Sequence, residues 1–86
     1  MRKAKRKTKS PKAPSTVDEY IGARMRGSRL ALGMTQESLG ELLGVTFQQV
    51  QKYEKGANRV SAARLFQICE ALQVSLASMF ERKLKD

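Results

Sequence analysis

Residues 36–56, QESLGELLGVTFQQVQKYEKG, contain two short apolar-periodic segments on either side of Gly44. The apolar residues at helical spacing are Leu39, Leu42 and Leu43 in the first segment, and Val50 and Tyr53 in the second. Gly44 can adopt a positive φ at the end of the first helix. Thr46 is a favourable N-cap for the second helix, which we expect to begin at Phe47. The pattern therefore predicts a helix, a tight turn and a second helix.

Six residues of this segment follow a recognisable spacing: Gln36, Gly40, Gly44, Val50, Glu54 and Gly56. With this spacing the chain resembles the phage-repressor and Cro-like helix-turn-helix family, the XRE-type DNA-binding domains, over residues 20–80. One departure is Gly40, where the family more often has alanine. A glycine inside a helix indicates that another backbone comes close. The resemblance implies an all-α fold, a compact five-helix bundle of the lambda-repressor-like type whose helices 2 and 3 form the helix-turn-helix.

The rest of the chain predicts the other three helices. A helix over residues 17–32 has one face formed by Ile21, Met25, Ser28, Arg29 and Leu32. Gly33 ends this helix, and Thr35 caps the next one. Ser61 begins a fourth helix and Ser75 caps a short fifth one. The apolar residues expected to pack inward are Leu65, Ile68, Cys69 and Leu72 in the fourth helix, and Leu76, Met79 and Phe80 in the fifth.

The formal net charge of +9 is concentrated at the N-terminus, where residues 1–16 contain seven basic side chains and no acidic one. We expect a disordered basic arm at residues 1–16, a helix-turn-helix domain at residues 17–82 and a charged tail at residues 83–86. The arm either binds nucleic-acid phosphates or a minor groove, or is a solubilising leader without a role in binding. No lipidation motif or amphipathic helix favours a membrane surface.

Composition excludes several classes of site. The chain has 86 residues, enough for one small domain, and it contains one cysteine and no histidine. Neither an internal disulfide nor a Cys/His zinc site can form, and Cys69 is expected to be a small buried hydrophobe. No apolar run approaches the roughly 18 residues of a membrane span. We expect a cytoplasmic protein without metal, cofactor, small-molecule ligand or enzymatic activity.

The helix that begins at Phe47 has an outward side suited to reading base edges. With Val50 and Tyr53 turned inward, the outward residues are Phe47, Gln48, Gln51 and Lys52. Glutamine pairs with adenine, lysine donates to guanine, and the phenylalanine ring can cover a thymine methyl group. On an arbitrary helix such glutamines would only face solvent, but their position after a helix-turn-helix hinge favours DNA binding. The resemblance implies base contacts at Phe47, Gln48 and Lys52.

Residues flanking this helix are expected to contact DNA phosphates, which fix the register of the protein on the duplex. Gln36 and its neighbouring amides lie at the positive end of a helix dipole, and Thr35 and Thr46 can add hydroxyl groups. The resemblance adds the loop residues Lys55, Asn58 and Arg59.

The resemblance also implies a structural ion pair between Arg29 and Glu54. This pair would hold the reading helix against the first helix, and its loss would leave a buried charge uncompensated. The alternative is two separate surface charges, which would contribute almost nothing to stability.

The predicted function is that of a sequence-specific DNA-binding transcriptional regulator, a repressor-like protein. As a homodimer it would place the third helix of each subunit in successive major grooves of a short palindromic operator in double-stranded DNA. The alternative is an antitoxin-like or adaptor module that uses the same fold for protein interaction, with DNA binding secondary. An exposed apolar patch and little sequence preference on DNA would favour that alternative.

Overall fold

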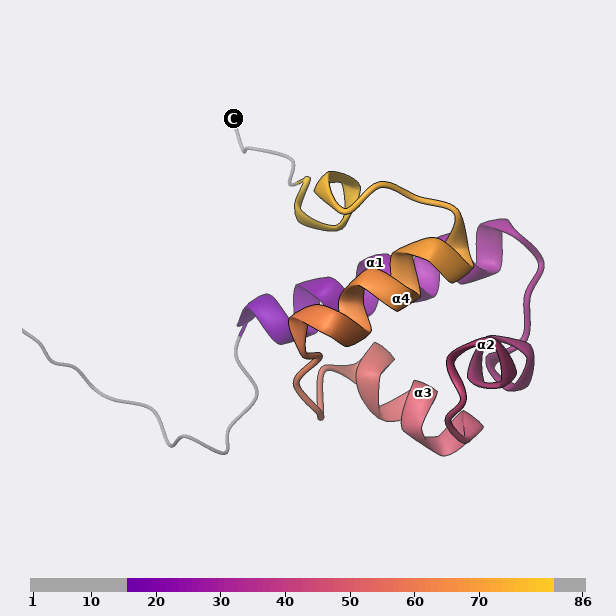
Figure 1. Ribbon diagram of the computed structural model, residues 1–86. Coiled ribbons are helices and arrows are strands. Elements are labelled where there is room, and N and C mark those ends of the chain that lie inside the picture. Colours follow the sequence, from indigo (N-terminus) through magenta and orange to yellow (C-terminus); the bar gives the residue numbers. More distant parts are fainter. Residues whose placement is uncertain (1–15, 82–86) are drawn as a thin grey trace, which may run out of the picture.

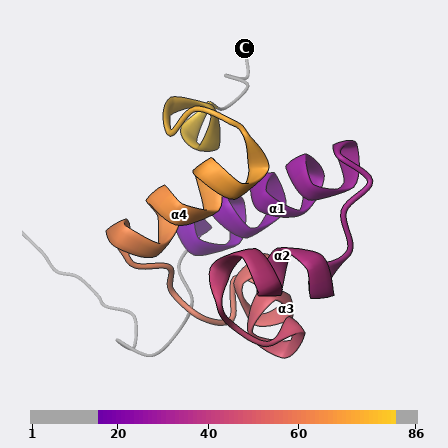
Figure 2. The ribbon, with the colours of Figure 1, turned by 45° about the vertical axis from the view of Figure 1, so that its right-hand side comes forward.

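The computed structural model describes residues 16–81, and in this part of the chain four α-helices are followed by one 3-10 helix. The elements are α1 (Thr16–Ala31), α2 (Gln36–Leu43), α3 (Phe47–Lys55), α4 (Ala62–Leu72) and η1 (Ala77–Phe80). Figure 1 shows α1 and α4 side by side, with α2 and α3 on one side of them and η1 on the other. The rotated view in Figure 2 keeps this arrangement. Residues 16–81 therefore form an all-helical fold with no strand.

The prediction of five α-helices is wrong at the C-terminal end. Residues 77–80 form a single 3-10 turn, and Glu81 after it is extended. Ser75 is not the N-cap of this turn: that position is Leu76, which provides no side-chain hydrogen bond, although the Ser75 Oγ accepts a hydrogen bond from the Ser78 amide at 3.1 Å. A segment of four residues is typical of a short 3-10 piece, which seldom runs longer.

The first helix begins and ends one residue earlier than the predicted range of 17–32. Thr16 is the first residue of α1, which ends at Ala31. The rest of the predicted arm, residues 1–15, and the predicted tail at residues 83–86 lie outside the described residues.

The predicted starts of α2, α3 and α4 are confirmed by their caps. The Thr35 Oγ1 accepts from the Ser38 amide at 2.9 Å, and the Thr46 Oγ1 accepts from the Gln49 amide at 3.2 Å. Ser61 caps α4 in the same way. α2 ends at Gly44 with φ 76°, the left-handed conformation that glycine adopts without a steric penalty.

The core lies between all five elements. Its buried apolar residues are Ile21, Met25, Leu39, Leu43, Val50, Tyr53, Leu65, Ile68, Cys69, Leu72 and Met79. Leu42 was predicted on the apolar face of α2 but is 62% exposed. Successive helix residues are rotated by about 100°, so Leu42 lies about 60° from Leu39 and about 100° from Leu43, at the edge of the side that those two leucines share. Leu32, predicted on the core face of the first helix, follows the end of α1 and is exposed.

Two glycines permit close contacts that position α3. A Cβ added at Gly40 would lie 2.7 Å from the Val45 carbonyl oxygen, which confirms the predicted close approach of a second backbone. A Cβ added at Gly22 in α1 would lie 2.5 Å from the carbonyl oxygens of Tyr53 and Glu54 in α3. The backbones of α1 and α3 are therefore in contact at Gly22, and any larger residue there would force the two helices apart.

Candidate nucleic-acid interface

α3 has a buried side and an exposed side. Val50 and Tyr53 are buried in the core, whereas Gln48 and Lys52 are exposed. The structure also leaves Phe47 at the surface, and Gln51 is half-buried. We call the four residues Phe47, Gln48, Gln51 and Lys52 the outer face of α3. Figures 1 and 2 show that α3 lies at the edge of the molecule remote from η1.

The charge on α3 matches an anionic partner. Lys52 and Lys55 are exposed in the last turn of the helix. The helix contains one acid, Glu54, which is buried. Its carboxylate is removed from the surface, so the exposed side of α3 carries only amide, aromatic and cationic groups besides the backbone.

Glu54 forms a buried, bidentate ion pair with Arg29. The Arg29 Nε donates to the Glu54 Oε2 at 2.7 Å, and the Arg29 Nη2 donates to Oε1 at 3.1 Å. The side chains are only 7% and 2% exposed. The Arg29 Nη1 also donates to the Met34 carbonyl at 2.8 Å. The two charges are therefore buried and paired, unlike the alternative of two separate surface charges. The pair links α1 to the end of α3.

Gln36 joins the same network. Its Nε2 donates to the Glu54 Oε1 at 3.1 Å, so the first residue of α2 contacts the end of α3. The sequence interpretation gave Gln36 a phosphate contact and missed this role. The side chain is half-buried, and its amide nitrogen is held by the carboxylate. A helix N-terminus presents backbone N–H groups to anions, so the group of Gln36 suited to a phosphate is its backbone N–H at the start of α2.

The remaining candidate phosphate residues differ in exposure and in whether their side chains already make hydrogen bonds within the protein. The side chains of Thr35 and Thr46 accept backbone amides as N-caps. Lys55 is exposed and Asn58 is half-buried. The Arg59 side chain is 67% exposed, and its Nε donates to the Asp18 Oδ2 at 3.2 Å.

Sequence reasoning missed Asp18. Its only signal was an acid in the first turn of a predicted helix, which is a common helix-start feature and names no partner. Arg64 was missed in the same way: its Nη1 donates to the Leu43 carbonyl at 2.8 Å, which satisfies an acceptor at the C-terminal end of α2.

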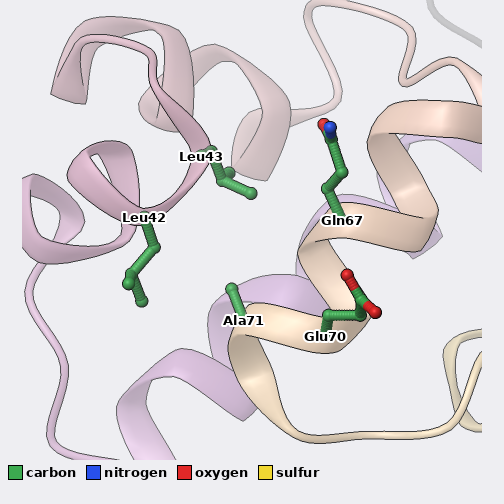
Figure 3. Close-up of a pocket in the computed structure, with 5 residues that line it drawn as sticks. All are labelled: Leu42, Leu43, Gln67, Glu70 and Ala71. Carbon is green, nitrogen blue, oxygen red and sulfur yellow. The ribbon is translucent and has the colours of Figure 1, made fainter.

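A groove lies between α2 and α4. It has a volume of about 370 Å³ and is lined by Leu42, Leu43, Gln67, Glu70 and Ala71. Figure 3 shows the two leucines on α2 and the other three residues on α4. Its single carboxylate, from Glu70, provides no paired acid and base.

No group of three or more metal-ligating side chains lies together in residues 16–81. Burial raises the pKa of the Cys69 thiol, so it stays protonated and is a poor nucleophile, in agreement with the prediction of a small buried hydrophobe. Over the same residues, the helices are too short or too polar to cross a lipid bilayer.

Residues 25–78 match the family described as helix-turn-helix. A protein of Sinorhizobium medicae named as an uncharacterised HTH-type transcriptional regulator is 54% identical over 70 residues, covering 81% of this chain and 50% of the relative. A protein of Rhodospirillum rubrum named as an uncharacterised transcriptional regulator in the ATPase CF(0) region is 50% identical over 64 residues, which is 74% of this chain and 59% of that one. The chain spans about half the length of the curated relatives it matches.

Solved structures have the same arrangement of helices. The clp gene regulator ClgR from Corynebacterium glutamicum superposes with a TM-score of 0.74 at 30% identity, covering 77% of this chain and 86% of that one. The P22 c2 repressor in complex with a synthetic operator superposes with a TM-score of 0.64 at 27% identity, covering 69% and 89%.

Proposed function

We propose, since the chain belongs to the helix-turn-helix family, that it is a transcriptional regulator that places α3 in the major groove of double-stranded DNA. The observation that carries this proposal is the division of α3 into a buried apolar side and an exposed side of amides and lysines, with its one acid buried against Arg29. An α-helix fits the major groove, where each base pair presents a distinct pattern of donors and acceptors.

The outer face of α3 reads the bases. Gln48 and Gln51 can each make a bidentate pair with adenine, and Lys52 can donate to guanine. The Phe47 ring, 38% exposed at the start of α3, can cover a thymine methyl group. Gln51 is half-buried and therefore has less freedom to reach a base than Gln48.

Groups around α3 hold the DNA backbone. The start of α2 offers Thr35 and Gln36, and Thr46 precedes α3. Beyond α3, Lys55, Asn58 and Arg59 follow one another closely along the chain. Such contacts fix register and orientation, whereas the base edges supply the sequence preference.

We further propose that two copies bind a short palindromic operator. One α3 of nine residues reads few base pairs, and a homodimer doubles the number of contacts. The two helices would then enter successive major grooves, about 34 Å apart. The operator complex of the similar P22 c2 repressor supports DNA as the partner.

The N-terminal segment supplies the long-range attraction to DNA. Residues 16–81 contain seven basic and seven acidic side chains, so the described domain is formally neutral, and the +9 of the chain belongs to its two ends. Deleting residues 1–12 should weaken binding to every sequence and reduce the salt dependence of the affinity, because phosphate neutralisation does not depend on sequence. Unchanged affinity and unchanged salt dependence would show that the segment is only a leader.

The decisive experiment is selection of bound sequences from a random DNA pool, followed by measurement of the stoichiometry of the complex. We expect one palindromic consensus bound by two copies. Gln48→Ala should weaken binding to that consensus and leave binding to random DNA nearly unchanged. A pool in which no sequence is enriched would contradict the proposal.

A second candidate function is an antitoxin-like or adaptor module. One observation favours it: Leu42, which lines the α2–α4 groove, is 62% exposed, so the groove offers an apolar surface to a protein segment. This reading predicts weak DNA binding without sequence preference, so the same pool selection separates the two candidates.

A further inference from the structure

We propose that Asp18 is a positioning residue that holds the guanidinium of Arg59 ready for a DNA phosphate. This inference rests on the proposed function. Asp18 lies in the first turn of α1, and Arg59 lies in the loop between α3 and α4. The Asp18 Oδ2 accepts a hydrogen bond from the Arg59 Nε at 3.2 Å, across 41 positions of the sequence.

The two side chains have very different environments. The Asp18 carboxylate is 9% exposed, whereas the Arg59 side chain is 67% exposed. The acid is therefore fixed by the protein, and the arginine projects from it into solvent. The pair gives a mostly exposed arginine a fixed point of attachment, which a side chain with four rotatable bonds would otherwise lack.

The contact leaves the binding edge of the arginine available. Because the hydrogen bond to Asp18 uses Nε, the two terminal Nη groups can still donate to another acceptor. These groups form the planar fork that binds a phosphate through two parallel hydrogen bonds. An arginine held at Nε and exposed at its terminal edge is thus oriented for an anion.

The loop that carries Arg59 lies beside α3. The amides of Ala57 and Asn58 donate to the Lys52 carbonyl at 2.9 and 3.3 Å, so the loop is bound to the last turn of α3. A Cβ added at Gly56 would lie 2.7 Å from the Glu19 Cα, which brings the start of α1 against the same turn. In Figure 1 the loop descends on the side of the molecule where α3 lies.

A positioning role predicts a change of affinity opposite in sign to simple charge repulsion. An acid close to DNA repels phosphate, so removing its charge should strengthen binding if charge alone matters. If Asp18 orients Arg59, Asp18→Asn should instead weaken binding, because a neutral amide oxygen holds a guanidinium less strongly than a carboxylate does. Glu19→Gln is the matched control: it removes the same charge from the same turn of α1, and Glu19 is exposed.

The experiment measures the Kd of the full chain for the selected operator and for random DNA at several salt concentrations. We expect Asp18→Asn to weaken binding to both DNAs by about three- to tenfold, and Glu19→Gln to leave it unchanged or strengthen it. Arg59→Gln should weaken binding by about tenfold and lower the salt slope by about 1. In the Arg59→Gln background, Asp18→Asn should cause a smaller loss of DNA affinity than it does in the wild-type chain.

The outcomes separate the inference from the proposed function. If the wild-type chain binds its operator but Asp18→Asn and Glu19→Gln change the Kd for DNA equally, the positioning role alone is overturned. A wild-type chain without sequence preference would overturn the proposed function itself. If Asp18→Asn does not fold, as judged by circular dichroism, Arg59→Lys decides: it keeps the charge and loses the fork, so affinity should fall while the salt slope stays. Wild-type affinity in Arg59→Lys would overturn the inference.

Discussion

α2 and α3 have similar lengths and similar caps. Each follows a threonine whose side chain accepts a backbone N–H, and each ends at a glycine with positive φ. Their exposed sides differ in charge: α2 exposes Glu37 and Glu41, whereas α3 exposes Lys52 and Lys55. The same local chemistry thus forms both helices, and the side chains that caps and core leave unconstrained make one helix acidic and the other basic.

The burial of Glu54, the one acid in α3, makes this difference in exposed charge between the two helices possible. Glu54 is held under the helix by Arg29 and Gln36, so its charge stabilises the junction of α1, α2 and α3 instead of facing an anionic partner. α2 has no such network for its exposed acids. The comparison teaches that the outer face of α3 depends on a buried ion pair as much as on its own residues.

The largest expected effect comes from breaking that pair. Glu54→Gln should lower the free energy of unfolding by about 3 to 5 kcal/mol, because it leaves the buried Arg29 charge uncompensated. Chemical denaturation followed by circular dichroism measures the change. The double variant Arg29→Met, Glu54→Met should recover most of the loss, since no buried charge remains. A loss below about 1 kcal/mol in Glu54→Gln would mean that the pair behaves as a surface pair.

The next effect concerns the contact between α1 and α3. Gly22→Ala should lower the free energy of unfolding by about 1 to 3 kcal/mol, because its Cβ would lie 2.5 Å from two carbonyl oxygens of α3. Gly27→Ala in the same helix is the control, since nothing lies within 4 Å of its added Cβ. It should stabilise the protein by about 0.5 to 1 kcal/mol through helix propensity. Thermal denaturation of both variants tests the contrast, which disappears if the two helices separate readily.

Truncating one exposed side chain on each helix to alanine tests whether only α3 reads the DNA sequence. Lys52→Ala should weaken binding to the preferred site by about 1 to 3 kcal/mol and binding to random DNA much less. Glu41→Ala on α2 truncates an exposed charged side chain of similar length and should leave sequence preference unchanged. Fluorescence anisotropy with both DNAs gives the four affinities. Equal losses on the two DNAs for Lys52→Ala would assign this lysine to the phosphates.

The smallest effect is expected on the exposed side of α2. Leu42→Ala should change the free energy of unfolding by no more than about 0.5 kcal/mol, since Leu42 is 62% exposed. Leu39→Ala, at a fully buried position three residues earlier, should cost about 2 to 5 kcal/mol. Urea denaturation of the two variants compares them directly. A large loss in Leu42→Ala would indicate that the α2–α4 groove is closed in solution.

The parts of the fold that follow from local chemistry were predictable from the sequence. Thr35, Thr46 and Ser61 marked helix starts because a side-chain oxygen next to a helical pattern satisfies an orphan amide. Gly40 indicated a close backbone through its cost in a helix. Leu42 was misplaced because three apolar residues within five positions can satisfy more than one helical face, and only the packing of α2 on α3 and α4 chooses between them.

The candidate site was predictable in composition and less so in connection. The residues of the outer face of α3 followed from the inward turn of Val50 and Tyr53. The partnership of Asp18 with Arg59 joins residues 41 positions apart, and no local spacing encodes such a pair. The hydrogen bond from Gln36 to Glu54 was hidden for the same reason, since either side chain alone reads as a helix-end polar group.

The arrangement of the two ends of the described domain guides how the protein is labelled. The start of α1 lies against the loop that follows α3, whereas η1 packs on α1 at the far side of the molecule (Figure 1). A fluorophore or affinity tag attached next to Thr16 would crowd the proposed DNA surface. One attached next to Glu81 leaves that surface clear, so immobilisation through the C-terminal side is the geometry suited to single-molecule work.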